Sequence, residues 1–137
     1  MTFTTELRPG GIMPPLERAI ALPDMVAYAG ATWDWHRLHY DTDYVKAMQV
    51  PAPVVDGQVF GALLVEALQD WLGPAWWVRR LDFRFANLVF AGETVRCEGE
   101  ITSLDDGVVT VALRVLVIGD RARAAVETAS AEVQVRS

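Results

Sequence analysis

The sequence predicts an α+β fold in which an antiparallel β-sheet wraps one long central helix. One segment in the middle of the chain repeats apolar residues at three- and four-residue spacing, which is typical of a helix with a buried face. The segments that follow alternate apolar and polar residues, which is typical of strands that bury one face of a sheet. Because each element leaves an apolar face to cover, we expect the helix and the sheet to cover each other.

The N-terminal third predicts short elements around one bend. Residues 1–15 are rich in Gly and Pro and predict an extended arm, followed by a short strand over residues 16–22. Pro23 suits the first turn of a helix that runs to about residue 33. After a bend at residues 34–41, Asp41 or Thr42 caps a second short helix, which ends before Pro51 and Pro53.

The dominant helix is predicted over residues 57–72. Its polar side chains fall within one arc of about 120°, and the rest of its circumference is apolar. Such a helix is expected to be buried on several sides. The Gly73-Pro74 pair ends it.

Four strands are predicted after the helix, over residues 77–86, 93–104, 108–118 and 121–135. Asp105-Asp106-Gly107 and Gly119-Asp120 are hairpin signals, so the last three strands are expected to form an antiparallel meander. A curled sheet around a single helix is the hot-dog architecture. We expect one hot-dog domain over residues 1–137.

Composition and charge exclude several classes of function. The chain of 137 residues is 52% apolar, which is enough for a sizeable core. Its net charge of −6 argues against a nucleic-acid partner, because phosphate binding needs a basic surface. No apolar run approaches the ~18 residues that a membrane helix needs, and with no signal peptide the cytoplasm is expected. The single cysteine, Cys97, allows no internal disulfide and is expected in the core.

The bend over residues 34–41 concentrates the groups that can carry proton chemistry. Asp34, His36, His39 and Asp41 lie within eight residues, and the chain has no other histidines. Asp34 and His39 are five positions apart and would not share a helix face, but across a bend they can converge on one water molecule. The residues alone equally allow a hydrogen-bonded pair that only fixes the bend.

This stretch resembles the MaoC-like family of (R)-specific enoyl-CoA hydratases and dehydratases. The family motif Asp-x-Asn-Pro-(Leu/Ile)-His-x-Asp is matched at Asp34, Leu38, His39 and Asp41. The family has a His-Gly pair at the start of the central helix, and Gly57 stands at the matching spacing after His39. The resemblance runs from residue 16 over most of the chain and includes residues 83–85 and 90–95, which look like the family's substrate-side strand and the turn after it.

The chain departs from this pattern at several positions. His36-Arg37 replaces the Asn-Pro pair, Asp56 replaces the histidine of the His-Gly pair, and Val65 stands where some members carry a hydroxyl residue. These departures resemble the smaller chains of two-subunit hydratases from actinobacterial steroid side-chain degradation. Those chains act beside a second hot-dog chain.

The resemblance implies an enoyl-CoA hydratase or dehydratase that adds water to a trans-2-enoyl thioester to give a 3-hydroxyacyl thioester. Asp34 and His39 would be the catalytic residues that hold the water, and the backbone amide of Gly57 would form the oxyanion hole. The residue types suit these roles, since a carboxylate accepts a proton and an imidazole accepts or donates one near neutral pH. No metal and no cofactor are expected. The expected partners are the acyl-CoA substrate and either a second copy or a second hot-dog chain.

The other polar groups near the motif have plainer expected roles. Asp56 is expected to cap the long helix, and His36 to be a solvated loop residue, although either is also able to face the substrate. Arginines 79, 80 and 84 are expected on a solvated strand face. A contact between their guanidinium groups and the phosphates of coenzyme A is the alternative.

Two other functions remain open from the sequence. A hot-dog thioesterase would place a carboxylate within the central helix, where Glu66 is the only candidate, on the polar arc. A non-catalytic subunit would bind acyl-CoA or act as a scaffold, and keep the Asp34–His39 pair without using it. The sequence leaves open the acyl group, the direction of the reaction, and whether coenzyme A or acyl carrier protein holds the thioester.

Overall fold

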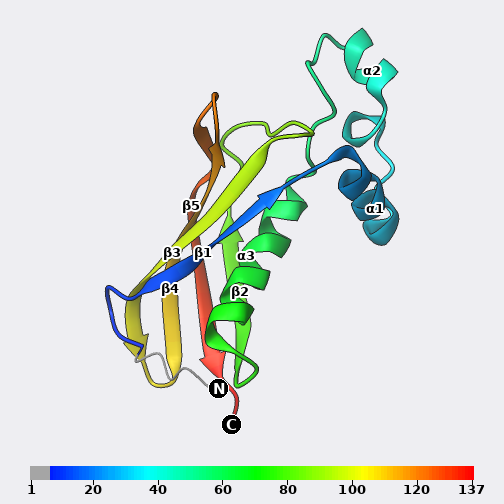
Figure 1. The fold of residues 1–137 in the computed structure, drawn as a ribbon. Helices are drawn as coiled ribbons and strands as arrows, with labels where there is room; N and C mark the ends of the chain where they lie inside the picture. The colour runs from blue at the N-terminus through cyan, green and yellow to red at the C-terminus, as the bar shows by residue number, and fades with distance from the viewer. Residues whose placement is uncertain (1–6) are drawn as a thin grey trace.

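The computed structural model describes residues 7–137 (Figure 1). The N-terminal part holds β1 (Ile12–Ala19), α1 (Leu22–Thr32), the 3-10 turn η1 (Arg37–His39) and α2 (Thr42–Ala47). The remainder holds α3 (Gln58–Leu72), β2 (Trp76–Phe83), β3 (Thr94–Asp105), β4 (Val108–Ile118) and β5 (Arg123–Val135).

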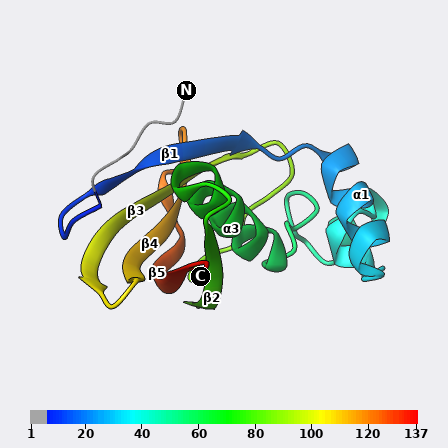
Figure 2. The same ribbon diagram turned by 90° about the horizontal axis from the view of Figure 1, so that it is seen from below.

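The five strands form one antiparallel sheet in the order β1-β3-β4-β5-β2. Figure 2 shows the sheet curving around α3, with α1 beyond the end of the sheet near the start of α3. The predicted α+β hot-dog arrangement is confirmed. The predicted meander is also present, because β3, β4 and β5 are neighbours in chain order. Its first turn has Asp106 at φ 50° and Gly107 at φ 74°, the left-handed pair that a tight hairpin needs.

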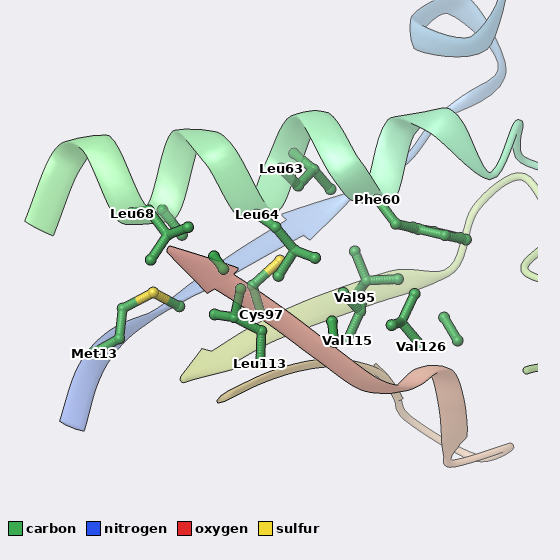
Figure 3. Packing of buried hydrophobic residues seen from close by; sticks show 14 of the residues in the cluster. Met13, Phe60, Leu63, Leu64, Leu68, Val95, Cys97, Leu113, Val115 and Val126 are labelled. Carbon is green, nitrogen blue, oxygen red and sulfur yellow. The ribbon is translucent and has the colours of Figure 1, made fainter. Parts of the chain in front are cut away.

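The core lies between α3 and the concave face of the sheet. Phe60, Leu64 and Leu68 point from α3 toward the strands, where Cys97 and Val115 are fully buried (Figure 3). This burial is the main stabilising contribution that holds the helix in the sheet. At fifteen residues α3 is the longest helix of the described chain, and no helix among residues 7–137 is long and apolar enough to cross a membrane.

The opposite side of α3 is less covered than the sequence predicts. Ala62 is exposed, and Val59 and Val65 are only partly buried. The prediction of burial on several sides is wrong for the isolated chain, because its sheet covers one side of the helix. The apolar excess on α3 therefore lies on a surface that this chain does not itself cover.

The N-terminal boundaries also differ from the prediction. The strand was expected over residues 16–22 after an extended arm, but β1 begins at Ile12 and ends at Ala19. Pro14 and Pro15 fit into it because β1 is an edge strand and its register with β3 shifts between Met13 and Leu16. Residues 1–6 of the predicted arm lie outside the described residues.

The buried thiol gives the first prediction. Burial raises the pKa of Cys97 from 9.0 to about 12, so at pH 8 only about one thiol in ten thousand is ionised in the folded protein. We expect iodoacetamide to leave Cys97 unmodified in the native state and to modify it fully in urea, as measured by intact mass. The raised pKa also means that the unfolded chain loses this proton first, so stability should decline as the pH rises from about 9 toward 12. Rapid labelling of the native protein would contradict the burial.

Candidate active site

The end of α1 sets the position of Asp34. The helix stops at Trp33, which adopts a left-handed conformation with φ 58°. The backbone N–H groups of Trp33 and Asp34 both donate to the carbonyl of Ala29, the latter over 3.0 Å. A left-handed residue other than glycine costs about 1 kcal/mol or more, and it turns the chain sharply here. Asp34 is therefore the first side chain after the turn.

Two local caps shape the rest of the bend. The Nδ1 atom of His36 accepts a hydrogen bond from the Leu38 amide at 3.0 Å and so caps η1, while its ring is exposed. Asp41 accepts from the Tyr44 amide at 3.0 Å and from Arg37 Nε at 2.8 Å. The first of these bonds, helped by the second, lowers the pKa of Asp41. The predicted capping role of Asp41 is confirmed, and His36 lies on the surface as expected.

His39 is held by a backbone link to the segment before α3. Its Nδ1 atom lies 2.8 Å from the carbonyl oxygen of Val54, and the Val54 amide donates to the carbonyl of Leu38 at 2.9 Å. A carbonyl only accepts, so Nδ1 carries a hydrogen and donates it. The other ring nitrogen, Nε2, faces two carboxylates, 3.9 Å from Asp34 Oδ2 and 4.0 Å from Asp56 Oδ2.

A small cavity of about 10 Å³ lies among these three groups. That volume is about what one water molecule occupies, and the polar lining supplies the partners that a bound water needs. The separations of Nε2 from the two carboxylates are too long for direct hydrogen bonds and fit a bridging water instead. The cavity is lined by Met25, Tyr28, Ala29, Asp34, His39, Asp56 and Val59. The structure thus brings together Asp34 and His39, as the sequence predicts.

The structure brings two further groups to the cavity, Tyr28 and Asp56. Burial raises the pKa of Tyr28, and the negative charge of Asp56 raises it further, so the hydroxyl stays protonated as a hydrogen-bond donor. Asp56 lies one residue before the N-cap Gly57, and its Oδ1 accepts from the Gln58 amide at 3.0 Å, so it satisfies a free amide of α3 as a cap does. Its second oxygen, however, faces the cavity. Tyr28 stands ahead of the motif on α1, and no spacing rule points to it.

His39 also borders a larger groove of about 270 Å³. Gly57 lies in this groove directly before the first residue of α3, at a helix end where backbone amides have no partner within the helix. The ring of Phe85 packs so closely on Gly57 that a Cβ atom there would overlap it. One turn along α3, the ring of Phe83 packs on Gly61 in the same way, and a Cβ atom at Gly61 would overlap that ring.

One wall of the groove is held by an arginine on β5. Arg123 donates to the Leu88 carbonyl at 2.7 Å and to Glu93 Oε1 at 2.6 Å. The same carboxylate oxygen accepts from the Phe90 amide at 2.9 Å. These bonds fix the loop between β2 and β3, which carries Leu88 and Val89 into the groove.

The remaining candidate residues lie away from the cavity. Arg79 pairs with Glu132 at 2.8 Å, and Arg80 pairs with Asp82 at 2.7 Å. Arg84 is exposed and lines a separate hollow beside Phe85. The exposed arginine face is as expected, and a contact with phosphates stays a prediction.

Asp34, His39 and Asp56 also form a possible ligand set for a metal ion. One atom from each of them lies within 4.8 Å of the others, and this is the only such group of three within residues 7–137. Imidazole and carboxylate are ligands that several divalent metals accept. The expectation that the site works without a metal stays a prediction.

Comparison with known proteins gives both a family and relatives. The model of the MaoC like domain matches residues 11–127. The chain is 28% identical over 102 residues to the 3-oxo-4,17-pregnadiene-20-carboxyl-CoA hydratase beta subunit of Mycobacterium tuberculosis, a match that covers 74% of this chain and 79% of that relative. It is 32% identical over 89 residues to the peroxisomal hydratase-dehydrogenase-epimerase of Saccharomyces cerevisiae, a match that covers 64% of this chain and 10% of that larger protein.

Two solved structures extend the likeness over nearly the whole chain. A chain of the ChsH1-ChsH2 complex from Mycobacterium tuberculosis superposes with a TM-score of 0.84 at 27% identity, covering 94% of this chain and 98% of that one. The (R)-hydratase from A. caviae involved in PHA biosynthesis gives a TM-score of 0.87 at 25% identity, covering 97% and 100%.

The Arg123–Glu93 pair predicts an acid-sensitive loop. The hydrogen bond from Arg123 lowers the pKa of Glu93 below 4.5, and the Phe90 amide lowers it further. The ionised pair therefore contributes stability above about pH 4.5, and this contribution is lost as the pH falls through the folded-state pKa. We expect Glu93→Gln to cost about 1–2 kcal/mol near neutral pH and to flatten this acid dependence, as measured by urea unfolding. Glu127→Gln, an exposed change on β5, is the control, and equal acid dependence in both variants would contradict the prediction.

Proposed function

The chain belongs to the MaoC-like domain family, and from that membership and the geometry of its cavity we propose that it is an enoyl-thioester hydratase, or a dehydratase in the reverse direction. The observation that carries the proposal is the cavity of about 10 Å³ between Asp34 and His39, whose ring also lines the groove that holds Gly57. A hydratase needs a held water, a bound thioester oxygen and a proton for Cα. Each of these has a candidate group here.

Asp34 and His39 would hold and activate the water. The side chain of Asp34 is 46% exposed and that of His39 16%, and of the two only His39 lines both the cavity and the groove. As the water oxygen attacks Cβ of the enoyl group, its proton passes to one of the two side chains. Because Val54 fixes the ring of His39, the direction of Nε2 is set before the substrate arrives.

Gly57 would hold the thioester oxygen. Among residues 7–137, its backbone N–H donates to no other group, and the helix dipole of α3 is positive at this end. Negative charge develops on the thioester oxygen as the water adds, so a donor there lowers the barrier, typically by ~3–4 kcal/mol. The ring of Phe85 fills the space that a Cβ atom would take at Gly57, so the oxygen would approach the amide from another side.

The proton balance closes within the site. The water O–H bond breaks, the oxygen binds Cβ, and the electron pair of the double bond moves to the enolate of the thioester. Collapse of that enolate takes a proton onto Cα from the Asp34–His39 pair, which regains one from the water. Delivery from one side of the substrate gives syn addition, and we carry over the (R) configuration of the product from the family.

The relatives support coenzyme A as the thioester carrier and a second hot-dog chain as the partner. One relative is a beta subunit of a pregnadiene-carboxyl-CoA hydratase, and one similar structure is a two-protein complex. The exposed apolar side chains Phe85 and Leu88 at the groove, together with the uncovered side of α3, suit such a partner. A second copy of this chain is the other partner that these surfaces allow.

A thioesterase is less well supported by the geometry. Its expected carboxylate, Glu66, pairs with Arg18 at 2.7 Å on the surface of α3 and β1 and lines neither the cavity nor the groove. A non-catalytic subunit would share the fold and the cavity. Substitution of Asp34 or His39 distinguishes it from a hydratase.

Substitution of the pair tests the hydratase directly. Asp34→Asn keeps the shape of the side chain and an acceptor oxygen but removes the proton acceptor, so kcat should fall by about 10²–10⁴-fold with little change in melting temperature. His39→Gln should lower kcat to a similar extent, whereas Asp43→Asn on the exposed face of α2 should leave turnover unchanged. If Asp34→Asn turns over at the native rate, the pair is not catalytic and the chain is a binding or scaffold subunit.

A substrate panel tests the partner and the acyl group. The pure chain is incubated with trans-2-enoyl-CoAs from short-chain to steroid-sized, and loss of the enoyl absorbance is followed. We expect turnover only once the groove is closed by a second hot-dog chain, either a second copy of this chain or a different one. Thioester cleavage, detected as free thiol, would instead favour a thioesterase.

A further inference from the structure

The two carboxylate oxygens of Asp56 make different contacts. Oδ1 accepts the hydrogen bond from the Gln58 amide at 3.0 Å and so fixes the side chain at the start of α3. This leaves Oδ2 directed at the cavity, 4.0 Å from His39 Nε2, with the side chain only 14% exposed. A cap alone explains the first contact and gives no reason for the second.

The surroundings of Asp56 support a charge that faces the cavity. Asp56 and Asp34 both approach the same imidazole nitrogen, at 4.0 and 3.9 Å, and one oxygen of each lies within 4.8 Å of the other. Tyr28 lines the same cavity, and the charge of Asp56 adds to the rise of its pKa. Two carboxylates this close repel each other unless a positive group or a proton lies between them.

The number of hydrogens at the cavity limits the hydrogen bonds that can form there. The Nδ1 hydrogen of His39 is used by the Val54 carbonyl, so a neutral ring offers only a lone pair at Nε2. A water in the cavity has two hydrogens for the three acceptors, namely Nε2 and the two carboxylates, and the Tyr28 hydroxyl on the same lining supplies a third donor. Asp56 Oδ2 is one of the acceptors that would fix the orientation of this water.

We propose that Asp56 is a third catalytic carboxylate, whose Oδ2 accepts a hydrogen bond from the same water that Asp34 and His39 hold. The inference rests on the proposed hydratase function and deepens it. As the water oxygen binds Cβ, one of the three side chains takes the proton that the water releases. The same group of three returns a proton to Cα, so no external acid or base is consumed.

The test uses substitutions that keep the cap. Asparagine and serine are both good acceptors at a helix start, so Asp56→Asn and Asp56→Ser should keep the melting temperature within a few degrees. Removal of the charge should lower kcat about 100-fold while KM changes less than about threefold, because Asp56 contacts water and not the acyl thioester. A structural role alone would leave kcat unchanged in variants that remain fully folded. Native kcat in a fully folded Asp56→Asn protein overturns the proposal.

The two proposals fail differently. If the wild-type chain hydrates no enoyl-CoA, alone or with a partner, the hydratase function fails and the role of Asp56 in it fails too. If the wild type is active and Asp56→Asn is equally active, the hydratase function stands and Asp56 is only a helix cap.

Discussion

The site depends on one short connection between two stretches of backbone that are distant in sequence. The Val54 carbonyl accepts from His39 Nδ1 while the Val54 amide donates to Leu38, so the bend after α1 and the chain entering α3 are joined in both directions. This link sets which nitrogen of the ring carries hydrogen and where the other one points. It also brings Asp34, on one side of the link, within reach of Asp56 on the other.

Much of the fold was predictable because its patterns are local. The periodicity over residues 57–72 and the alternation after it predicted α3 and the meander closely, and Asp105-Asp106-Gly107 placed the first hairpin correctly. The pairing of Asp34 with His39 and the place of Gly57 followed from motif spacing. The errors have tertiary causes. The prolines of β1 are tolerated only because that strand lies at the edge of the sheet, and sequence alone does not give strand order.

The missing parts of the site share one property, since their roles are set by contacts across the fold. Tyr28 enters the cavity because α1 ends where it does, and the Val54 carbonyl belongs to backbone that carries no residue signal at all. Asp56 was predicted as a cap, which is correct for one oxygen. A carboxylate has two acceptor oxygens, so one can bind the start of the helix while the other faces His39. Spacing along the sequence predicts only the first contact. The half-covered side of α3 is a similar case, because its apolar residues are explained by a surface outside the chain.

The two aromatic rings seated on glycines of α3 have a mechanical consequence. Phe85 packs on Gly57 and Phe83 on Gly61, and the two rings stand edge to face at 5.7 Å. Because every other position of that helical turn carries a Cβ atom, moving the helix along the strand by a single step would drive side chains into both rings. The two rings therefore fix the position of α3 along β2 and the residues that follow it. The place of the Gly57 amide is then set by close contacts between rings and backbone, which no polar interaction has to maintain.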